Sequence, residues 1–192
     1  MVEMNLDSNQ KNTLLEIARK TVEAVTAGRK IPDFIINDNI LRTECGAFVT
    51  IHKKGNLRGC IGNIAGSMPL WETVRKMAVE ASLHDPRFAP VSAGELGEID
   101  IEISVISPFE KISDINKIVV GKHGLFIRQG FYQGLLLPQV AAEYKWGRIE
   151  FLEHTCNKAG LYRDCYKEKN CEIFIFSADV FGESGEQETH LS

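Results

Sequence analysis

The segment from Ala47 to Ile61 constrains the fold of this chain most strongly, because it has the pattern of a β-hairpin. Apolar and polar residues alternate up to His52, a turn rich in Lys, Gly and Asn follows, and a second strand begins at Leu57. A hairpin of this kind buries one of its two faces. The length of the turn therefore decides which side chains reach the core and which reach solvent.

The turn leaves two registers open. A two-residue turn would place the apolar side chains of the first strand on the same face as Arg58 and Cys60. A three-residue turn, over residues 54–56, would place them on the opposite face. Because register follows the hydrophobic face, we predict the three-residue turn. The core face would then carry Val49, Ile51, Leu57, Gly59 and Ile61, and the other face Thr50, His52, Arg58 and Cys60, with Cys60 opposite Thr50.

Within the hairpin, the stretch Leu57-Arg58-Gly59-Cys60-Ile61-Gly62 is the candidate functional site. Glycine in a strand gives up packing, and it usually marks a place where another group approaches the backbone closely. Cys60 is the candidate nucleophile, since a guanidinium or exposed backbone N–H groups nearby would lower the pKa of a thiol. Arg58, Gly59 and Gly62 are candidate binding residues. Alternatively, Cys60 is a small buried hydrophobe and Arg58 pairs with a surface acid.

Four further residues are candidates for binding at the same site. Asp85 and Arg87 flank Pro86. They form either a pair that faces the site across a rigid turn or a salt bridge that holds only its own loop. Gln139 and Glu143 are four residues apart and would share one face of a helix. In one interpretation, both side chains point into a cleft. In the other, they only cap the helix.

Helical periodicity and capping residues predict three long helices, and alternation predicts two further strands. The expected helices cover residues 8–26, 67–82 and 148–159, and the expected strands cover residues 100–105 and 171–176. Together with the hairpin, these elements predict an α+β fold in which antiparallel or mixed sheets are flanked by helices.

The second half of the chain repeats the theme of the hairpin. Gly124–Ile127 resembles Gly46–Val49, and Leu135–Pro138 falls at the offset of Leu57–Cys60. One interpretation is an internal duplication of a β-β-α unit, with the two units facing each other across a cleft. The other is two ordinary hairpins. A mismatch of strand order between the two sheets would rule the duplication out.

The overall composition excludes several classes of protein. The net charge of -4 and the pI of about 5.8 argue against a dedicated nucleic-acid binder. No apolar run approaches the roughly 18 residues of a membrane span, and the first residues lack the pattern of a signal peptide, so we expect a cytoplasmic protein. The five cysteines form no Cys-x-x-Cys pair. Free thiols are therefore expected, and we predict neither a metal site nor a cofactor.

Motifs along nearly the whole chain resemble those of the AMMECR domain family. They are Leu57-Arg58-Gly59-Cys60-Ile61-Gly62, Pro69-Leu70-Trp71, Asp85-Pro86-Arg87-Phe88, Ile101–Pro108, Leu136–Ala141 with Glu143 and Trp146, Phe151-Leu152, and Cys156–Leu161. The resemblance implies one α+β domain over residues 1–192, built from two subdomains. The short length resembles the prokaryotic members called AmmeMemoRadiSam system protein A, which implies a Memo-like protein and a radical S-adenosylmethionine protein as partners. It implies no particular reaction.

Two functions remain open on the sequence. In the first, the chain is an adaptor whose glycine-rich hairpin and cleft receive a partner protein, a peptide or a small molecule. In the second, Cys60 is the nucleophile of an enzyme that acts on a small molecule, or the thiol of a partner in radical chemistry, and Arg58 holds an anionic group. No residue is clearly placed as the base, for which His52 and His84 are the candidates. The sequence contains no complete triad, metal-ligand set or phosphate loop, so we favour the adaptor.

Overall fold

The computed structural model describes residues 6–64 and 66–184 of the chain. These residues divide into two compact units. The larger unit comprises residues 6–106 and 179–184, and the smaller unit comprises residues 107–178. Each unit has a four-stranded sheet and a hydrophobic core of its own. The predicted α+β fold class is confirmed.

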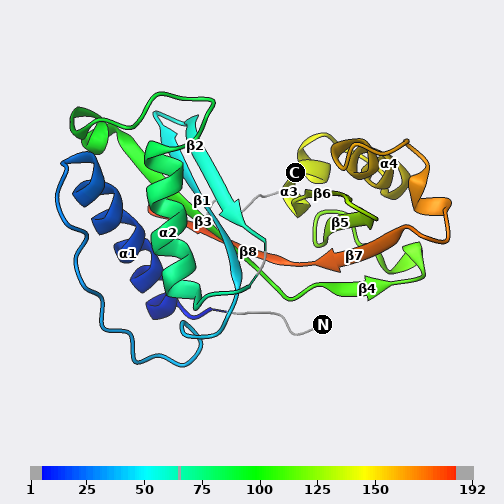
Figure 1. The fold of residues 1–192 in the computed structure, drawn as a ribbon, viewed down its shortest axis with the longest axis horizontal. Helices are drawn as coiled ribbons and strands as arrows, with labels where there is room; N and C mark the ends of the chain where they lie inside the picture. The colour runs from blue at the N-terminus through cyan, green and yellow to red at the C-terminus, as the bar shows by residue number, and fades with distance from the viewer. Residues whose placement is uncertain (1–5, 65, 185–192) are drawn as a thin grey trace. The chain divides into compact units, whose positions relative to one another are not determined.

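In the larger unit, two helices cover one face of the sheet (Figure 1). The helices are α1 (Ser8–Thr26) and α2 (Leu70–Leu83), and a short 3-10 helix, η1 (Ala93–Glu98), precedes the third strand. The strands, in their order across the sheet, are β2 (Asn56–Asn63), β1 (Gly46–Lys53), β3 (Ile99–Ile106) and β8 (Ala178–Gly182). The strand β2, which carries Cys60, therefore lies at an edge of the sheet.

The core of the larger unit forms where the helices meet the alternating apolar side chains of the central strands. Val49 and Ile51 of β1 and Ile103 of β3 have no exposed surface, and Ile101 is 1% exposed. Each pair of opposite residues shares a face, since Val49 lies opposite Ile103 and Ile51 opposite Ile101. The polar residues that alternate with these apolar ones in β1 and β3 lie on the opposite face of the sheet, and so does the candidate site.

The turn between β1 and β2 is shorter than predicted. It consists of Lys54 and Gly55, whose φ angles of 51° and 79° lie in the left-handed region. Positive φ at both positions is typical of the two-residue turns that match the twist of a hairpin. Arg58 then forms a β-bulge, because Ile51 lies opposite Gly59 whereas the next residue of β1 lies opposite Leu57.

The bulge compensates for the missing turn residue. One extra residue on β2 reverses its alternation, so that Cys60 lies opposite Thr50 as predicted. The prediction was wrong for Leu57. It lies opposite His52, on the face of Cys60, and is 43% exposed rather than part of the core.

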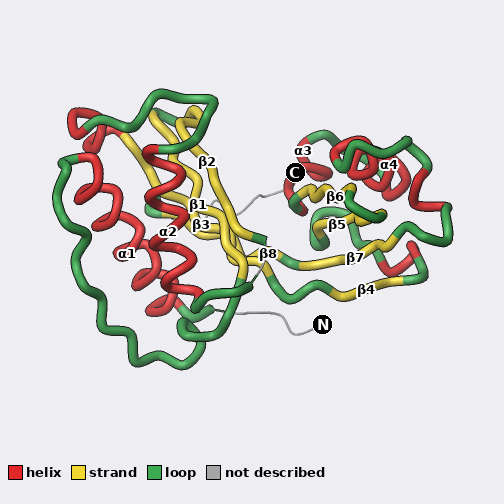
Figure 2. Tube along the Cα trace, viewed as in Figure 1, coloured by secondary structure: helices red, strands yellow, loops and turns green. Residues whose placement is uncertain are grey.

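The smaller unit has a sheet of its own with helices beside it (Figure 2). Its strands, in their order across the sheet, are β4 (Glu110–Ile112), β7 (Glu172–Phe176), β5 (Gly124–Gln129) and β6 (Tyr132–Leu136). Its helices are α3 (Pro138–Glu143) and α4 (Arg148–Lys158), with 3-10 turns η2 (Ile115–Lys117) and η3 (Cys165–Lys167). The helix α4 packs on β5 and β6 and covers a core that includes Phe151, Leu125 and Ile127.

Three strands of each sheet follow the order that an internal duplication requires, whereas the fourth differs, since β8 follows the other strands of its sheet in the chain and β4 precedes those of its sheet. In each, the second strand of the hairpin lies at an edge, and the first strand pairs antiparallel with a strand that follows the helices. Edge-strand glycines also match, since a Cβ atom at Gly59 or at Gly134 would collide with the backbone of a helix or its C-cap. The duplication itself stays a prediction.

The expectation of free thiols was wrong for two of the five cysteines. Cys156 in α4 and Cys165 in η3 form a disulfide, with their Cα atoms 6.2 Å apart. The chain reverses after α4 at Gly160, whose φ of 76° ends the helix. This reversal brings together two cysteines whose spacing in the sequence suggests no pairing. Cys45, Cys60 and Cys171 are free.

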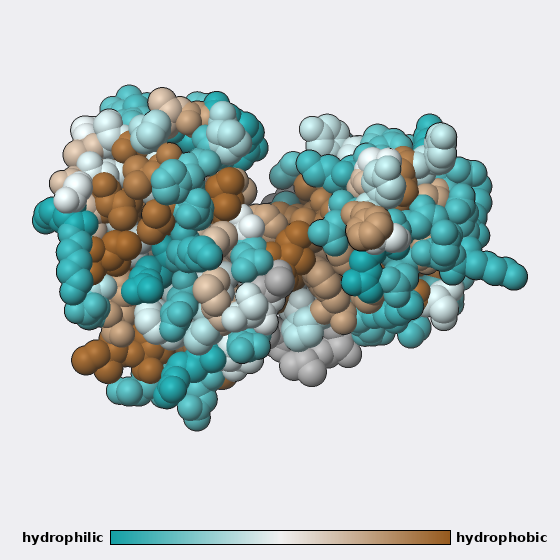
Figure 3. All heavy atoms as spheres, in the orientation of Figure 1, coloured by the Kyte–Doolittle hydropathy of each residue, from teal (hydrophilic) through white to brown (hydrophobic). Residues whose placement is uncertain are grey.

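Some large hydrophobic side chains remain at the surface. Ile35, Phe131 and Tyr162 are each more than four-fifths exposed. On the face drawn in Figure 3, hydrophobic residues lie among hydrophilic ones. Single apolar side chains are normal on a protein surface, so their exposure does not by itself identify a site.

Candidate functional site

Cys60 lies on the face of the larger sheet that points away from α1 and α2. It is opposite Thr50 of β1, and Thr50 is in turn opposite Glu102 of β3, so the three side chains form a row across neighbouring strands. The Thr50 hydroxyl donates a hydrogen bond to Sγ of Cys60 at 3.3 Å. The Cys60 thiol is thus partly exposed and is held by the Thr50 hydroxyl.

The loop from Asp85 to Arg87 holds the backbone of Cys60 from outside the sheet. The Cys60 N–H donates to Oδ2 of Asp85 at 2.8 Å, and the Cys60 carbonyl accepts from the Arg87 guanidinium at 3.1 Å. Asp85 and Arg87 form an ion pair at 2.7 Å. An edge strand leaves backbone groups unpaired on its outer side. Here an ion pair takes the place of the next strand at Cys60, and we call this arrangement the edge clamp.

The charge of Asp85 is stabilised although its side chain is only 2% exposed. Hydrogen bonds from the Arg87 side chain are the largest cause, and those from the N–H groups of Cys60 and Arg87 add to it. Together they outweigh burial and hold the pKa of Asp85 well below its ordinary value. The two interpretations of this loop are therefore compatible. Asp85 and Arg87 form a salt bridge within the loop, and the same two side chains contact the backbone of Cys60.

Arg58, at the bulge, is bound to acceptors of the protein itself. Its Nε and Nη2 atoms donate to the two carboxylate oxygens of Glu95 at 3.0 and 3.2 Å. Nη1 donates to the carbonyl of Ala89 at 2.8 Å, and Nη2 also donates to the carbonyl of Pro90 at 3.2 Å. The guanidinium thus connects β2 to the loop before η1 and to η1 itself.

Glu95 is a site residue that the sequence reading missed. Hydrogen bonds from Arg58 are the largest reason that its pKa lies well below the ordinary value, and Ser92 and Lys53 contribute. The N–H and hydroxyl of Ser92 both donate to Glu95 Oε2. Ser92 and Glu95 are three residues apart, the spacing of a capping box, and that spacing was the available signal.

The two glycines of the candidate site are in close contact with the protein itself. A Cβ atom at Gly59 would lie 2.2 Å from the carbonyl oxygen of Ala81 in α2. A Cβ atom at Gly62 would lie 2.1 Å from the ring of Phe48 in β1. The expected close approach to the backbone is therefore present, and the approaching groups are a helix carbonyl and an aromatic ring.

The remaining candidate residues lie in the smaller unit. Gln139 and Glu143 are on α3, whose first residue is Pro138. Gln139 is partly buried and Glu143 is exposed. The structure thus brings Arg58, Cys60, Asp85 and Arg87 together, while the cleft that would add α3 to them stays a prediction.

Within residues 6–64 and 66–184, no group of three or more His, Cys, Asp or Glu side chains is arranged to hold a metal ion. None of the helices described there is long and apolar enough to cross a membrane.

Comparison with known proteins identifies relatives over nearly the whole chain. The family model described as AMMECR1 matches residues 15–181. A protein of Methanothermobacter thermautotrophicus is 41% identical over 189 residues, which cover 94% of this chain and 97% of that protein. A protein of Nanoarchaeum equitans is 40% identical over 180 residues, covering 88% and 98%. The crystal structure of the uncharacterized protein PH0010 from Pyrococcus horikoshii is similar with a TM-score of 0.82 and 36% identity, covering 90% and 91%.

Proposed function

The chain belongs to the AMMECR1 family, and from this premise we propose that it is a binding protein that presents strand β2 around Cys60 to a partner protein. The observation that supports this most is the commitment of Arg58 and Arg87 to acceptors within the protein. A substrate anion at Arg58 would have to displace the carboxylate of Glu95. Bidentate arginine–carboxylate pairs of this kind are among the strongest hydrogen-bonded pairs in proteins.

The contacts of β2 suit a preformed docking face, because the backbone edge at Cys60 is already occupied by the edge clamp. The Arg58–Glu95 pair and the edge clamp fix the strand at two points, two residues apart. A strand that is already ordered loses little conformational entropy when a partner binds, so more of the contact energy appears as affinity. Leu57 adds an exposed apolar side chain on the face of Cys60.

The identity of the partner is a separate point of the proposal. The resemblance to AmmeMemoRadiSam system protein A favours the Memo-like protein and the radical S-adenosylmethionine protein, in the cytoplasm. The acidic balance of the chain favours protein over nucleic acid.

The test is a calorimetric titration of the chain with each of these two purified proteins. Leu57→Arg should weaken binding of a true partner by about tenfold or more, because a charge would replace a central apolar contact. Ile40→Arg is the matched control, since Ile40 is also 43% exposed but lies in the turn before β1, outside the hairpin. Equal weakening by both substitutions, or no binding of either protein to the unaltered chain, would contradict the proposal.

A second function, a cysteine-centred enzyme, is favoured by one observation. The Thr50 hydroxyl and the edge clamp hold the thiol and the backbone of Cys60 in place, and catalytic nucleophiles require such positioning. In this alternative Arg58 positions the strand and does not touch a small anionic substrate.

Site-resolved alkylation by iodoacetamide across a pH series separates the two functions. Fast labelling of Cys60 with a midpoint well below the roughly 8.5 of a free thiol would favour the enzyme. Slow labelling with an ordinary midpoint, together with unchanged partner binding by Cys60→Ser, would favour the binding protein.

A further inference from the structure

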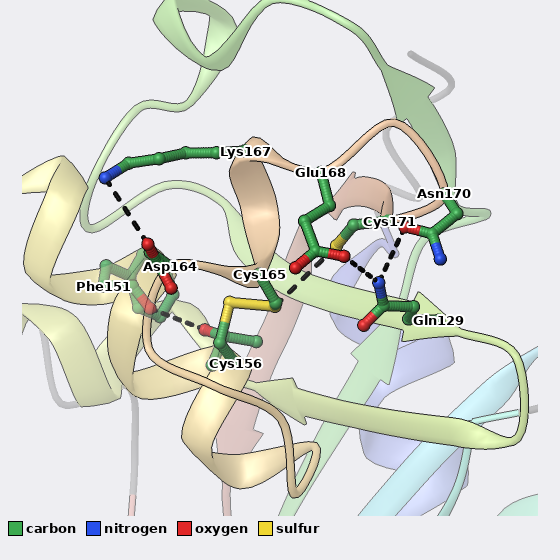
Figure 4. The surroundings of a disulfide bond; sticks show 10 residues. Gln129, Phe151, Cys156, Asp164, Cys165, Lys167, Glu168, Asn170 and Cys171 are labelled. Atoms are coloured by element: carbon green, nitrogen blue, oxygen red, sulfur yellow. Dashed lines mark hydrogen bonds and ion pairs between the residues drawn. A yellow bond between two sulfur atoms is a disulfide. The ribbon is translucent and has the colours of Figure 1, made fainter.

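Three cysteines of the smaller unit lie together, although the chain separates them. Cys156 in α4 and Cys165 in η3 form the disulfide, and Cys171 lies directly before β7 (Figure 4). The Cys171 thiol donates to Sγ of Cys165, with the two sulfur atoms 3.8 Å apart. A free thiol is therefore in contact with one sulfur of a disulfide.

The three sulfur-bearing residues differ in their access to solvent. Cys156 is fully buried and Cys165 is 2% exposed, whereas Cys171 is partly exposed. A reagent from solution therefore meets Cys171 before it meets either half of the disulfide. This order of exposure matters because thiol–disulfide exchange requires access to a sulfur atom.

We propose that Cys156, Cys165 and Cys171 form a thiol–disulfide exchange site in which Cys171 is the entry point. The Cys171 thiolate attacks Sγ of Cys165. The Cys165–Cys171 bond forms as the Cys156–Cys165 bond breaks, and the Cys156 sulfur leaves as a thiolate. Cys156 then takes up from solvent the proton that Cys171 gave up. This exchange transfers no net electrons, so it needs no oxidant or reductant.

The exchange moves the disulfide from a buried position to an accessible one. An external dithiol can then attack Cys171 and complete the reduction, leaving Cys165 and Cys171 as thiols while the dithiol is oxidised to its disulfide. The substrate class of the site is thus a dithiol. Exchange also frees the C-terminal turn of α4 from η3, since Cys156 no longer connects them. This activity lies in the smaller unit and does not depend on the binding function proposed for β2.

The surroundings of Cys171 keep the thiol protonated at rest. Burial, and then the carboxylates of Glu168 and Glu172, raise its pKa. Lys111 of β4 and Arg128 of β5 both form ion pairs with Glu172, which offset part of its charge. Gln129 donates from β5 to Glu168 and to Asn170, as Figure 4 shows. Exchange should therefore become faster as the pH rises.

Trypsin mapping can distinguish the two disulfides directly. Cleavage after Lys and Arg places Cys156 on the peptide 149–158, Cys165 on the peptide 164–167, and Cys171 on the peptide that begins at Asn170. The purified full chain is incubated at pH 8 with N-ethylmaleimide, quenched with acid and digested without reductant. The exchanged form is trapped as alkylated Cys156 together with a Cys165–Cys171 cross-link.

The rate of reduction by dithiothreitol provides the second measurement. Cys171→Ser should slow reduction of the disulfide in the folded chain at least tenfold and should abolish alkylation of Cys156. Cys60→Ser is the control, because Cys60 is a free thiol of the larger unit, and it should change neither measurement. Equal reduction rates for Cys171→Ser and the unaltered chain would overturn the proposal. So would absence of the Cys156–Cys165 cross-link from untreated protein.

Discussion

Gly59 and Gly62 are glycines because two groups of the protein occupy the space that a Cβ atom would need. At Gly59 the group is the carbonyl of Ala81, which belongs to the backbone of α2 and cannot rotate away. At Gly62 it is the ring of Phe48. At the residue scale, then, the glycines let β2 pack closely against α2 and β1, and loss of function after their substitution would first report on folding.

The first prediction concerns Gly59→Ala. Because the added methyl group would lie 2.2 Å from the Ala81 oxygen, the helix and strand must separate, and we expect a loss of about 1–3 kcal/mol in the free energy of unfolding. Urea denaturation measures it. Gly97→Ala is the control, since nothing lies within 4 Å of a Cβ atom there. A loss at Gly59 no larger than at Gly97 would contradict the packing argument.

At the scale of elements, the hairpin and the loops beside it are held together by mutual contacts. The two-residue turn and the bulge at Arg58 act together, because the bulge restores the alternation that the shorter turn changed. It also places Arg58 where its guanidinium meets Glu95. The loop at Asp85 then binds the outward backbone N–H and carbonyl of Cys60. Each of these contacts comes from a different element, so the site is held by the fold of the larger unit.

The second prediction concerns the pH dependence of this assembly. The pKa of Asp85 is lower in the folded chain than its unfolded value of about 3.9. Its stabilising contribution is therefore complete above that unfolded value and is lost as the pH falls toward the folded value. Asp85→Asn should lower the free energy of unfolding at neutral pH by about 1–3 kcal/mol. The free energy of unfolding of this variant should also decrease less steeply as the pH falls.

Guanidinium chloride denaturation at pH 7 and at pH 3 tests this expectation. Glu16→Gln provides a matched control, because Glu16 forms only an exposed pair with Lys20 on α1. An equally steep acid decline in Asp85→Asn and in the unaltered chain would show that the edge clamp does not contribute as proposed.

At the scale of the whole molecule, the chain leaves the larger unit after Ile106 and returns to it at Asp179. The segment between is closed at its base by Ser107 and Ser177. The Ser107 N–H donates to the Ser177 carbonyl at 2.9 Å, and the Ser177 N–H donates to the Ser107 hydroxyl at 2.8 Å. The smaller unit thus has adjacent ends, its own sheet and its own core.

The third prediction is that residues 107–178, expressed alone, fold into the smaller unit. A cooperative thermal transition and dispersed amide resonances in solution NMR would confirm it. We expect a lower melting temperature than for the full chain, because a domain this short buries a smaller fraction of its surface. Ser107→Ala should lower that temperature further by leaving the Ser177 N–H without its partner. A fragment without a cooperative transition would contradict the prediction.

The sequence alone determined the elements whose signals are local. The alternation in β1 and β3, the capping residues of α1 and the apolar face of α2 depend on residues a few positions apart, and these elements form close to where they were expected, although α2 begins at Leu70 and not at residue 67. The sequence also located the stretch that holds Cys60. Its glycines indicated a close approach to the backbone, although not which group approaches.

Only the tertiary structure decided the partners of the charged and sulfur-bearing side chains. Arg58 meets Glu95 and Asp85 meets the backbone of Cys60 across 37 and 25 residues. Cys156 bonds to Cys165 because the chain reverses at Gly160. The bulge at Arg58 is likewise decided in the sheet, since the hydrophobic register and the favoured turn can both be satisfied only by one extra residue. Such pairings depend on where separate elements meet, and local periodicity carries no information about that.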